Sequence, residues 1–305
     1  MKVLSFGSAN IDYLYELDHF VLPGETIQSQ SLTKNCGGKG LNQSIAIAQA
    51  GASVEHAGCV GRLDGEFLLN TLRAYGVGTC YIQAKDIPSG HAIIQVTPQG
   101  ENSIILYPGA NHAISEEQID GVLKDFSDGD FCVLQSEINC IESIMRKSHA
   151  KGMRIVLNPS PFSKDILNLP LELVEYFFLN EVEAAQLTGE SSFASMEQCL
   201  QKRFPRAKIV LTLGKNGSIF LHGQVRKACG IFPVQTVDTT AAGDTFTGFF
   251  IAGLTHGWTI ERCLQMASCA AALAVSKKGA AQSIPTLAET EAFFAEHQPL
   301  PFNAF

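Results

Sequence analysis

Between residues 131 and 213 the chain reads FCVL (131–134), RIVL (154–157), YFFL (176–179) and KIVLTL (208–213), with helical patterns between the runs. Short, continuous apolar runs of this kind are typical of strands that are buried on both faces of a sheet. Their alternation with helices is the pattern of βαβ units, in which successive strands lie parallel. The sequence therefore predicts an α/β fold with a mainly parallel central sheet.

The region before these runs predicts one more core strand and a hairpin. Val3–Phe6 is a short apolar run that ends at a glycine, as a buried strand does. Residues 93–97 and 103–107 are rich in β-branched residues, and they flank the turn cluster Pro98-Gln99-Gly100-Glu101-Asn102. They predict an antiparallel hairpin.

The region after the runs predicts two long helices, at residues 242–255 and 259–276. The second is rich in alanine, which allows close packing against a sheet or another helix. No internal repeat or linker interrupts the chain, so we expect one large domain over residues 1–305 with a small β element.

Composition and charge exclude several classes of protein. The chain has 305 residues, 46% of them hydrophobic and 17% charged, which excludes a mostly disordered protein. No apolar run reaches the roughly 20 residues that span a bilayer. A net charge of −8 without a basic cluster disfavours nucleic-acid and anionic-membrane partners. Nine cysteines without a C-x-x-C pair favour buried thiols over a disulfide framework or a zinc site. We expect a soluble, cytoplasmic protein that acts on a small molecule.

The strongest motif is Asp238-Thr239-Thr240-Ala241-Ala242-Gly243-Asp244-Thr245-Phe246, at the start of the first long helix. Small residues expose the amide groups of a helix N-terminus, which carries about +0.5 charge and suits an anion that grows during phosphoryl transfer. Asp244 lies in the first turn and could accept a proton as a general base. On spacing alone, a simple helix cap explains Asp244 equally well.

A second glycine-rich motif, Cys36-Gly37-Gly38-Lys39-Gly40-Leu41-Asn42, opens another predicted helix. Glycines allow the backbone to approach a ligand closely. The spacing is not that of a P-loop, and on its own the motif is more often a tight turn.

Two further motifs follow predicted strands. Asn180-Glu181-Val182-Glu183 comes directly after the run at 176–179, where ligands gather in open α/β sheets, and could hold water around Mg²⁺. A solvated, acidic helix start explains the same residues. Thr212-Leu213-Gly214-Lys215-Asn216-Gly217 borders a nucleotide or forms a plain hairpin turn.

Taken together and in this order, the motifs resemble the PfkB family of carbohydrate kinases, also called the ribokinase family. The similarity runs from Phe6-Gly7-Ser8 to Ser283-Ile284-Pro285. Three segments match the family's N-terminal signature: Gly7–Asp12, Pro23–Thr26 and Gly37–Asn42. Residues 238–244 match its C-terminal signature, D-T-x-A-A-G-D. Residues 107–111 and 157–161 also fit.

The resemblance implies a three-layer α/β/α fold with a small β-sheet lid, formed by segments near 13–35 and 91–107, and a homodimer through that lid. It implies ATP-dependent phosphorylation of a sugar's primary hydroxyl, with ribose to ribose 5-phosphate as the leading case. Deoxyribose, another pentose or ketose, or a nucleoside are alternative substrates. An alternative from another class is a non-catalytic sugar or nucleotide sensor on the same fold. A Rossmann dehydrogenase is disfavoured because no G-x-G-x-x-G follows a predicted strand.

The resemblance also assigns roles to individual residues. Asp244 matches the catalytic base, and Ala241, Ala242 and Gly243 match the anion hole. The sugar-contacting positions are matched by Asn10, Asp12, Gly38, Lys39, Asn42 and Glu137 together with Asp244. The nucleotide site is matched by Asn180, Thr212, Leu213, Gly214, Lys215, Asn216, Gly217, Gly243 and Asp244, and by Ser268 where some relatives carry a histidine.

Two metal ions are implied beside ATP. Glu183 completes an N-x-x-E element that is linked to Mg²⁺ through water. A monovalent-cation site for K⁺, made largely of backbone carbonyls, is matched by Asp238, Thr240, Ala274, Lys277, Gly279 and Ser283. The chain departs from the family at Thr240, where a branched apolar residue is common, and at Gln282, where proline is frequent.

Overall fold

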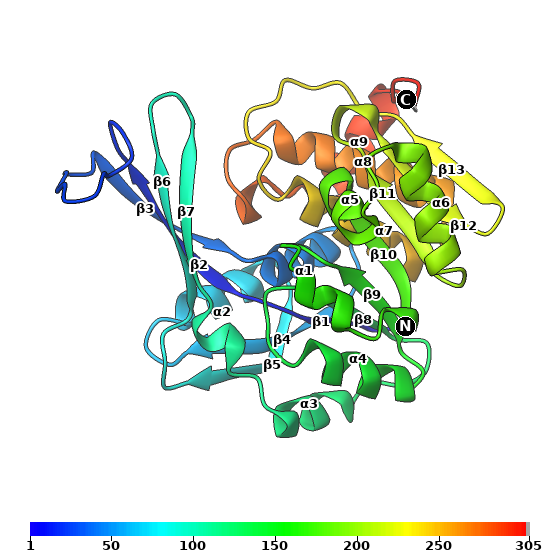
Figure 1. Ribbon diagram of the computed structural model, residues 1–305, viewed down its shortest axis with the longest axis horizontal. Helices are drawn as coiled ribbons and strands as arrows, with labels where there is room; N and C mark the ends of the chain where they lie inside the picture. The colour runs from blue at the N-terminus through cyan, green and yellow to red at the C-terminus, as the bar shows by residue number, and fades with distance from the viewer. Residues whose placement is uncertain (303–305) are drawn as a thin grey trace.

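The computed structural model describes residues 1–302, which form two β-sheets and the helices that cover the larger one (Figure 1). The larger sheet has nine strands in the order β13-β12-β11-β10-β9-β8-β1-β4-β5. All neighbouring strands are parallel except the antiparallel pairs β11–β12 and β12–β13. From the first strand of this order to the last, the bounds are Val225–Cys229, Ser218–His222, Lys208–Thr212, Val174–Asn180, Arg154–Asn158, Phe131–Gln135, Val3–Phe6, Val54–Gly61 and Gly78–Lys85.

Alternating side chains of the central strands separate two hydrophobic cores. On β8, Phe131 and Val133 belong to one core, whereas Cys132 and Leu134 belong to the other. The same alternation runs through β10, where Phe178 faces the first core and Phe177 the second. Strands that are buried on both faces need apolar residues at every position, which explains the continuous apolar runs of the sequence.

Helices cover both faces of this sheet, so the fold has the three layers that the sequence predicts. The face with Phe131 packs against α1 (Lys39–Gln49), α2 (Glu66–Ala74), α7 (Ala242–Thr255), α8 (Ile260–Val275) and α9 (Leu287–Glu296). The other face packs against α3 (Glu116–Leu123), α4 (Ile141–Ala150), α5 (Glu181–Thr188) and α6 (Phe193–Arg203). Among the described residues, five short 3₁₀ helices lie at Gly109–His112, Lys164–Asn168, Leu171–Leu173, Gly214–Asn216 and Ala281–Ser283.

The second sheet has four strands, in the order β3-β2-β6-β7, and projects from the body of the molecule (Figure 1). Its strands are β2 (Asn10–Glu16), β3 (Ser31–Gly37), β6 (Gly90–Val96) and β7 (Asn102–Tyr107). β6 and β7 are antiparallel, as the predicted hairpin requires, and β2 pairs with β6 in parallel. The predicted α/β/α fold with a small additional β-sheet is therefore confirmed. No helix within residues 1–302 is long and apolar enough to cross a membrane.

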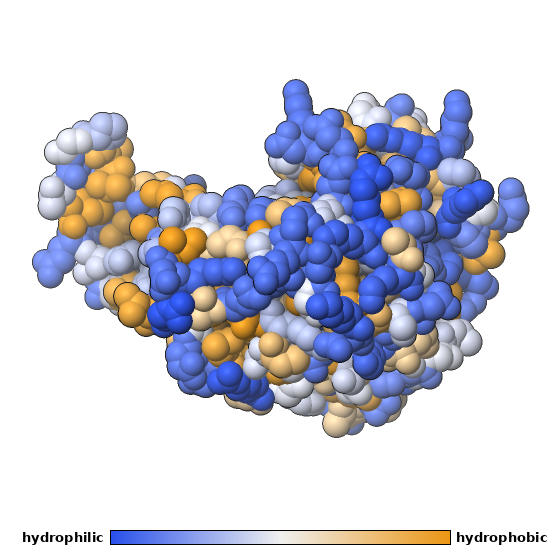
Figure 2. Space-filling model, turned by 90° about the horizontal axis from the view of Figure 1, so that it is seen from below, coloured by the Kyte–Doolittle hydropathy of each residue, from blue (hydrophilic) through white to orange (hydrophobic). Residues whose placement is uncertain are grey.

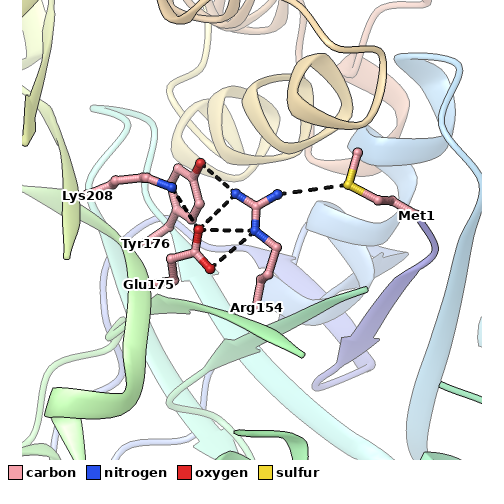
Figure 3. A network of polar contacts seen from close by, with 5 residues as sticks. All are labelled: Met1, Arg154, Glu175, Tyr176 and Lys208. Atoms are coloured by element: carbon pink, nitrogen blue, oxygen red, sulfur yellow. Dashed lines mark hydrogen bonds and ion pairs between the residues drawn. The ribbon is translucent and has the colours of Figure 1, made fainter. Parts of the chain in front are cut away.

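A network of charged and aromatic side chains connects the beginnings of three central strands (Figure 3). Arg154 at the start of β9 and Lys208 at the start of β11 each place a nitrogen 2.8 Å from Glu175 Oε1 on β10. The Arg154 guanidinium also lies 4.4 Å from the ring centroid of Phe131. The polar residues considered next lie at the opposite ends of the same strands, so this network stabilises the sheet away from them.

Candidate active site

A cavity of about 200 Å³ opens at the carboxyl ends of the central strands. Asn158, Asn180 and Thr212 are the last residues of β9, β10 and β11, and all three line it. Parallel strands end at one edge of the sheet, and the connections that follow leave a crevice there. The four predicted catalytic positions line the same cavity: Ala241, Ala242, Gly243 and Asp244.

The N-terminus of α7 points its amide groups at this cavity. Ala241, the N-cap, has φ of +59°, a left-handed conformation that is costly for a residue with a Cβ. No acceptor within residues 1–302 takes a hydrogen bond from the amides of Gly243 or Asp244. Unpaired first-turn amides and the helix dipole together form an anion-binding site.

The carboxylate of Asp244 is buried and held by two amides of α1. Asn42 Nδ2 donates to Asp244 Oδ2 at 3.2 Å, and Gln43 Nε2 donates to Asp244 Oδ1 at 2.9 Å. α7 can approach α1 so closely because of Gly248, where a Cβ would come within 2.3 Å of the Ala46 Cβ. Asn42 Oδ1 is buried without a hydrogen-bond partner within the described residues.

The loop that enters α1 is tied to the end of β8. Glu137 accepts hydrogen bonds from the hydroxyl of Ser8 and, at 2.8 Å, from the backbone amide of Lys39. Gly38 has φ of +92°, and a Cβ there would come within 3.1 Å of Asn10 N and Ser8 Oγ. Glycine is therefore required where the loop turns. Burial raises the pKa of Glu137, although the two hydrogen bonds oppose that shift.

Lys39 supplies the positive charge of the cavity. Burial by itself lowers the pKa of the Lys39 ammonium, but the carboxylates of Asp244, Glu137 and Glu183 outweigh it and the net effect raises this pKa. The lysine therefore stays protonated at neutral pH beside the unpaired amides of α7. A protonated lysine and unpaired amides at the same cavity together favour an anionic ligand.

Asn10 and Asp12 lie on β2, where the second sheet joins the body. Asn10 Oδ1 accepts a hydrogen bond from Asn111 Nδ2 at 2.6 Å, and Asn111 Oδ1 accepts from the Ala9 amide at 3.0 Å. Burial, with a smaller contribution from the charge of Glu137, raises the pKa of Asp12 to about 7. The predicted sugar-contacting residues thus gather around the loop at Gly38. Of this set only Lys39 and Asp244 line the smaller cavity, and the others line neither this cavity nor the larger one described next: Asn10, Asp12, Gly38, Asn42 and Glu137.

A second cavity of about 710 Å³ adjoins the first. The two share five lining residues: Asn180, Thr212, Thr239, Ala242 and Gly243. Gly214, Lys215, Gly217 and Ser268 line the larger cavity as well. Leu213 and Asn216 do not line it, and Leu213 packs into the hydrophobic core.

Asn180 and Glu183 form a capping box at the start of α5. Glu183 N donates to Asn180 Oδ1 at 2.8 Å, and Asn180 N donates to Glu183 Oε2 at 3.0 Å. Glu183 is buried and lines the smaller cavity, so these residues are not simply a solvated acidic helix start. The capping role fixes the carboxylate at the cavity wall.

The predicted cation-site residues meet where the loop before α7 touches the chain after α8. Asp238 Oδ1 accepts from Thr240 N at 2.9 Å, and Asp238 Oδ2 accepts from Gly279 N at 2.9 Å. Although partial burial opposes it, these hydrogen bonds hold the pKa of Asp238 below its ordinary value. Within residues 1–302, no three His, Cys, Asp or Glu side chains gather as a metal cluster.

Several residues of the site are missing from the sequence-based set. Gln43, on the first turns of α1, contacts Asp244 directly but carries no signal beyond its place after the glycine-rich motif. Thr239 lines both cavities and lies inside the 238–246 motif. The apolar wall of the larger cavity, formed by residues 231–234, has no motif that could have identified it.

The comparisons with known proteins agree on the family of this chain. The sequence model described as pfkB family carbohydrate kinase matches residues 1–287. The chain is 33% identical over 300 residues to a ribokinase of Haemophilus influenzae, covering 95% of this chain and 97% of that protein. It is 29% identical over 302 residues to a deoxyribokinase of Salmonella typhi, covering 94% and 96%. The structure of Arabidopsis thaliana ribokinase complexed with ribose and ATP matches with a TM-score of 0.87 at 28% identity, covering 96% of this chain and 98% of that one.

Proposed function

This chain belongs to the pfkB family of carbohydrate kinases, and from that premise we propose that it is an ATP-dependent kinase that converts D-ribose to D-ribose 5-phosphate. One observation carries the proposal. The carboxylate of Asp244 lies in the first turn of α7, beside unpaired amides, and lines a small polar cavity that adjoins a larger one at Ala242 and Gly243. A general base beside an anion hole is the arrangement that phosphoryl transfer to an alcohol requires.

Asp244 acts as the general base in the proposed reaction. The sugar's primary hydroxyl attacks the γ-phosphorus of ATP in line with the bond to ADP, which breaks as the new phosphate ester forms. Asp244 takes the proton of that hydroxyl. Asn42 and Gln43 hold the carboxylate so that it faces the hydroxyl, which preserves the geometry without reorganisation during the reaction.

The anion hole stabilises the charge that spreads over the transferred phosphoryl group. The amides of Gly243 and Asp244 are unpaired within the described residues and lie at the positive end of α7. Ala241 and Ala242 complete this turn without side chains that would obstruct a phosphate. Lys39 adds a full positive charge at the wall of the same cavity.

ATP fits the larger cavity. Its volume of about 710 Å³ is within the range of nucleotide and cofactor pockets. Apolar residues 231–234 and the small residues of α8 suit an adenine ring, while Ser268 offers a hydroxyl. The proposed nucleotide-binding residues are Asn180, Thr212, Gly214, Lys215, Gly217, Gly243, Asp244 and Ser268, together with Leu213 and Asn216 of the same turn.

Glu183 is the residue that would hold Mg²⁺, through a water molecule. The side chain is buried at the cavity wall and its orientation is fixed by Asn180, which fits a hard cation that keeps most of its waters. When bound with the nucleotide, Mg²⁺ supplies positive charge to the phosphate oxygens.

A K⁺ site is proposed where Asp238 meets Gly279. The hydrogen bond between them joins the loop before α7 to the chain after α8, so a cation there would steady the anion hole. Oxygen ligands from a carboxylate and several backbone carbonyls suit a hard cation. The proposed set is Asp238, Thr240, Ala274, Lys277, Gly279 and Ser283.

The sugar site is proposed at Asn10, Asp12, Gly38, Lys39, Asn42 and Glu137, beside Asp244. Carboxylates and amides of this kind grip a polyol because each takes or gives a hydroxyl hydrogen bond. A buried partner left without its hydroxyl would be costly, so the site should favour ribose over deoxyribose. The deoxyribokinase relative keeps deoxyribose as the principal alternative substrate.

The four-stranded sheet is proposed to act as a lid and as the surface of a homodimer within a single kinase domain. Its edge strand β7 exposes four consecutive apolar or aromatic side chains, Ile104 to Tyr107, and β3 exposes Leu32. Figure 2 shows apolar surface gathered on this projecting part of the molecule. A second copy of the chain that covers it would explain why apolar residues lie on an edge strand.

A coupled assay of ADP release tests the proposed function. Ribose, deoxyribose, fructose and adenosine are compared at saturating ATP, with and without K⁺. We expect the highest kcat/KM with ribose and stimulation by K⁺. A higher value with deoxyribose would replace ribose as the substrate, and no ADP release with any acceptor would favour a non-catalytic sensor.

A further inference from the structure

Gln43 is linked to Asp244 by a chain of side-chain hydrogen bonds that begins at a backbone carbonyl. Asn158 Nδ2 donates to the carbonyl oxygen of Phe178 at 2.9 Å. Gln43 Nε2 in turn donates to Asn158 Oδ1 at 3.1 Å and to Asp244 Oδ1 at 2.9 Å. Gln135 Nε2 donates to Gln43 Oε1 at 2.8 Å. This series of hydrogen bonds therefore joins β8, β9 and β10 to the proposed base on α7.

The direction of every bond in this chain is fixed by its first member. A carbonyl oxygen can only accept, so Asn158 must turn its NH₂ group toward Phe178 and its oxygen toward Gln43. Gln43 must then turn its own NH₂ group toward Asn158, which brings the second hydrogen of that group to Asp244. If the Gln43 amide were flipped, oxygen would face oxygen at both Asn158 and Asp244.

The environment of Gln43 makes this orientation costly to change. Gln43 has 0% of its surface exposed, so no solvent can replace a lost partner. Its oxygen accepts from Gln135 Nε2, so every polar atom of the Gln43 amide has a partner. A fully buried amide with three correctly oriented partners is rigid, and it transmits that rigidity to the carboxylate it contacts.

Asn42 alone would hold Asp244 less firmly. Its hydrogen bond to Asp244 Oδ2 is longer, at 3.2 Å, and Asn42 has no second protein partner within the described residues to fix its amide. With Gln43, each oxygen of the carboxylate receives one donor, and one lone-pair direction on each remains for the substrate.

We propose that Gln43 is a positioning residue that holds the Asp244 carboxylate in its reactive orientation. The proposal rests on the proposed kinase function, because it assigns Asp244 the role of base. It extends that function by naming a residue outside the sugar and nucleotide sites whose loss would reduce kcat without weakening nucleotide binding.

A double-mutant cycle with Gln43→Met and Asp244→Asn tests the proposal. Methionine nearly preserves the length and volume of glutamine but cannot donate to Asp244. We expect Q43M alone to lower kcat by roughly 10- to 100-fold at an unchanged ADP dissociation constant. In the D244N background the same change should alter the residual kcat by no more than about twofold, because the base that Gln43 positions is no longer present.

Ser44→Ala is the matched control. Ser44 is the next residue of α1, is fully buried, and donates to the Gly40 carbonyl at 2.8 Å, but it makes no hydrogen bond to Asp244. S44A should lower thermal stability with kcat within about twofold of the wild type. If Q43M lowered kcat by the same factor in both backgrounds, Gln43 would be merely structural and the proposal would fail.

A crystal structure of Q43M separates this proposal from the proposed function. We expect the Asp244 carboxylate to leave its wild-type position, whatever the activity of the enzyme. An unmoved carboxylate would overturn the positioning role even if the wild type phosphorylates ribose. A displaced carboxylate in a protein that phosphorylates no sugar would support the role of Gln43 and refute the kinase activity instead.

Discussion

The carboxylate of Asp12 lies against the backbone of Gly37, so closely that a Cβ on Gly37 would come within 2.0 Å of Asp12 Oδ2. The glycine is therefore needed for contact with a side chain, and not for a turn. It leaves room for a partly buried carboxylate at the junction of the second sheet with α1.

Gly37→Ala should weaken sugar binding because Asp12 must move to admit the methyl group. We expect the dissociation constant for ribose to rise by about tenfold or more, as for the loss of one buried hydrogen bond to a charged group. Isothermal titration with ribose measures it. Gly121→Ala is the control, since a Cβ at this helical position meets nothing within 4 Å; equal affinity in both variants would refute the role of Asp12 in the sugar site.

The stability of the protein should fall as Asp12 ionises. The pKa of Asp12 is raised to about 7, so between the unfolded value near 4 and this value the folded state binds more protons, and stability decreases with rising pH. Asp12→Asn removes this penalty, and above pH 7 we expect it to raise the free energy of unfolding by on the order of 2–4 kcal/mol. Urea denaturation at pH 5 and pH 8 measures the difference. If the difference in the free energy of unfolding between D12N and the wild type were the same at pH 5 and pH 8, the raised pKa of Asp12 would be contradicted.

The left-handed N-cap of α7 should tolerate glycine and reject a branched side chain. Ala241 has φ of +59°, a conformation that glycine adopts freely and that valine adopts at a cost. Ala241→Gly should keep kcat within about threefold of the wild type, whereas Ala241→Val should lower both thermal stability and kcat because the amides of the anion hole shift. Steady-state kinetics of both variants test this; full activity in A241V would show that the strained turn is not needed for catalysis.

The sequence allowed the central part of the fold to be predicted because strands buried on both faces leave a continuous apolar run. β8, β9, β10 and β11 all lie within one or two residues of their predicted bounds. β4, in contrast, contains Glu55, His56 and two glycines, and the edge strand β5 is half exposed, so neither has such a run. These strands could be recognised only from their pairing in the sheet.

The site could be predicted to the extent that it lies in motifs. The 238–244 segment and the glycine-rich loop were identified because helix starts that expose amides restrict the residue type at each position. Gln43 escaped prediction because its role depends on Asp244, 201 residues away in the chain, and a buried glutamine in a helix has no characteristic pattern. Leu213 and Asn216 were included with their turn, although only their neighbours line the cavity.

The network at the beginnings of β9, β10 and β11 should affect stability and not activity. Glu175→Gln leaves the partly buried charges of Arg154 and Lys208 without their carboxylate, and we expect a loss of roughly 1–3 kcal/mol in the free energy of unfolding. Thermal denaturation and kcat are measured together. Glu142→Gln, which breaks an exposed pair with Arg146, is the control and should change stability little. A reduced kcat in folded E175Q would contradict this and show that the network at the beginnings of these strands affects the site at their carboxyl ends.

The most direct measurement of the central claim is ribose-dependent ADP release by Asp244→Asn, beside calorimetric binding of ribose to the same variant. If Asp244 removes the proton from the sugar's hydroxyl, kcat should fall by about 10²–10⁴-fold while the variant still binds ribose. Turnover near that of the wild type would contradict the account.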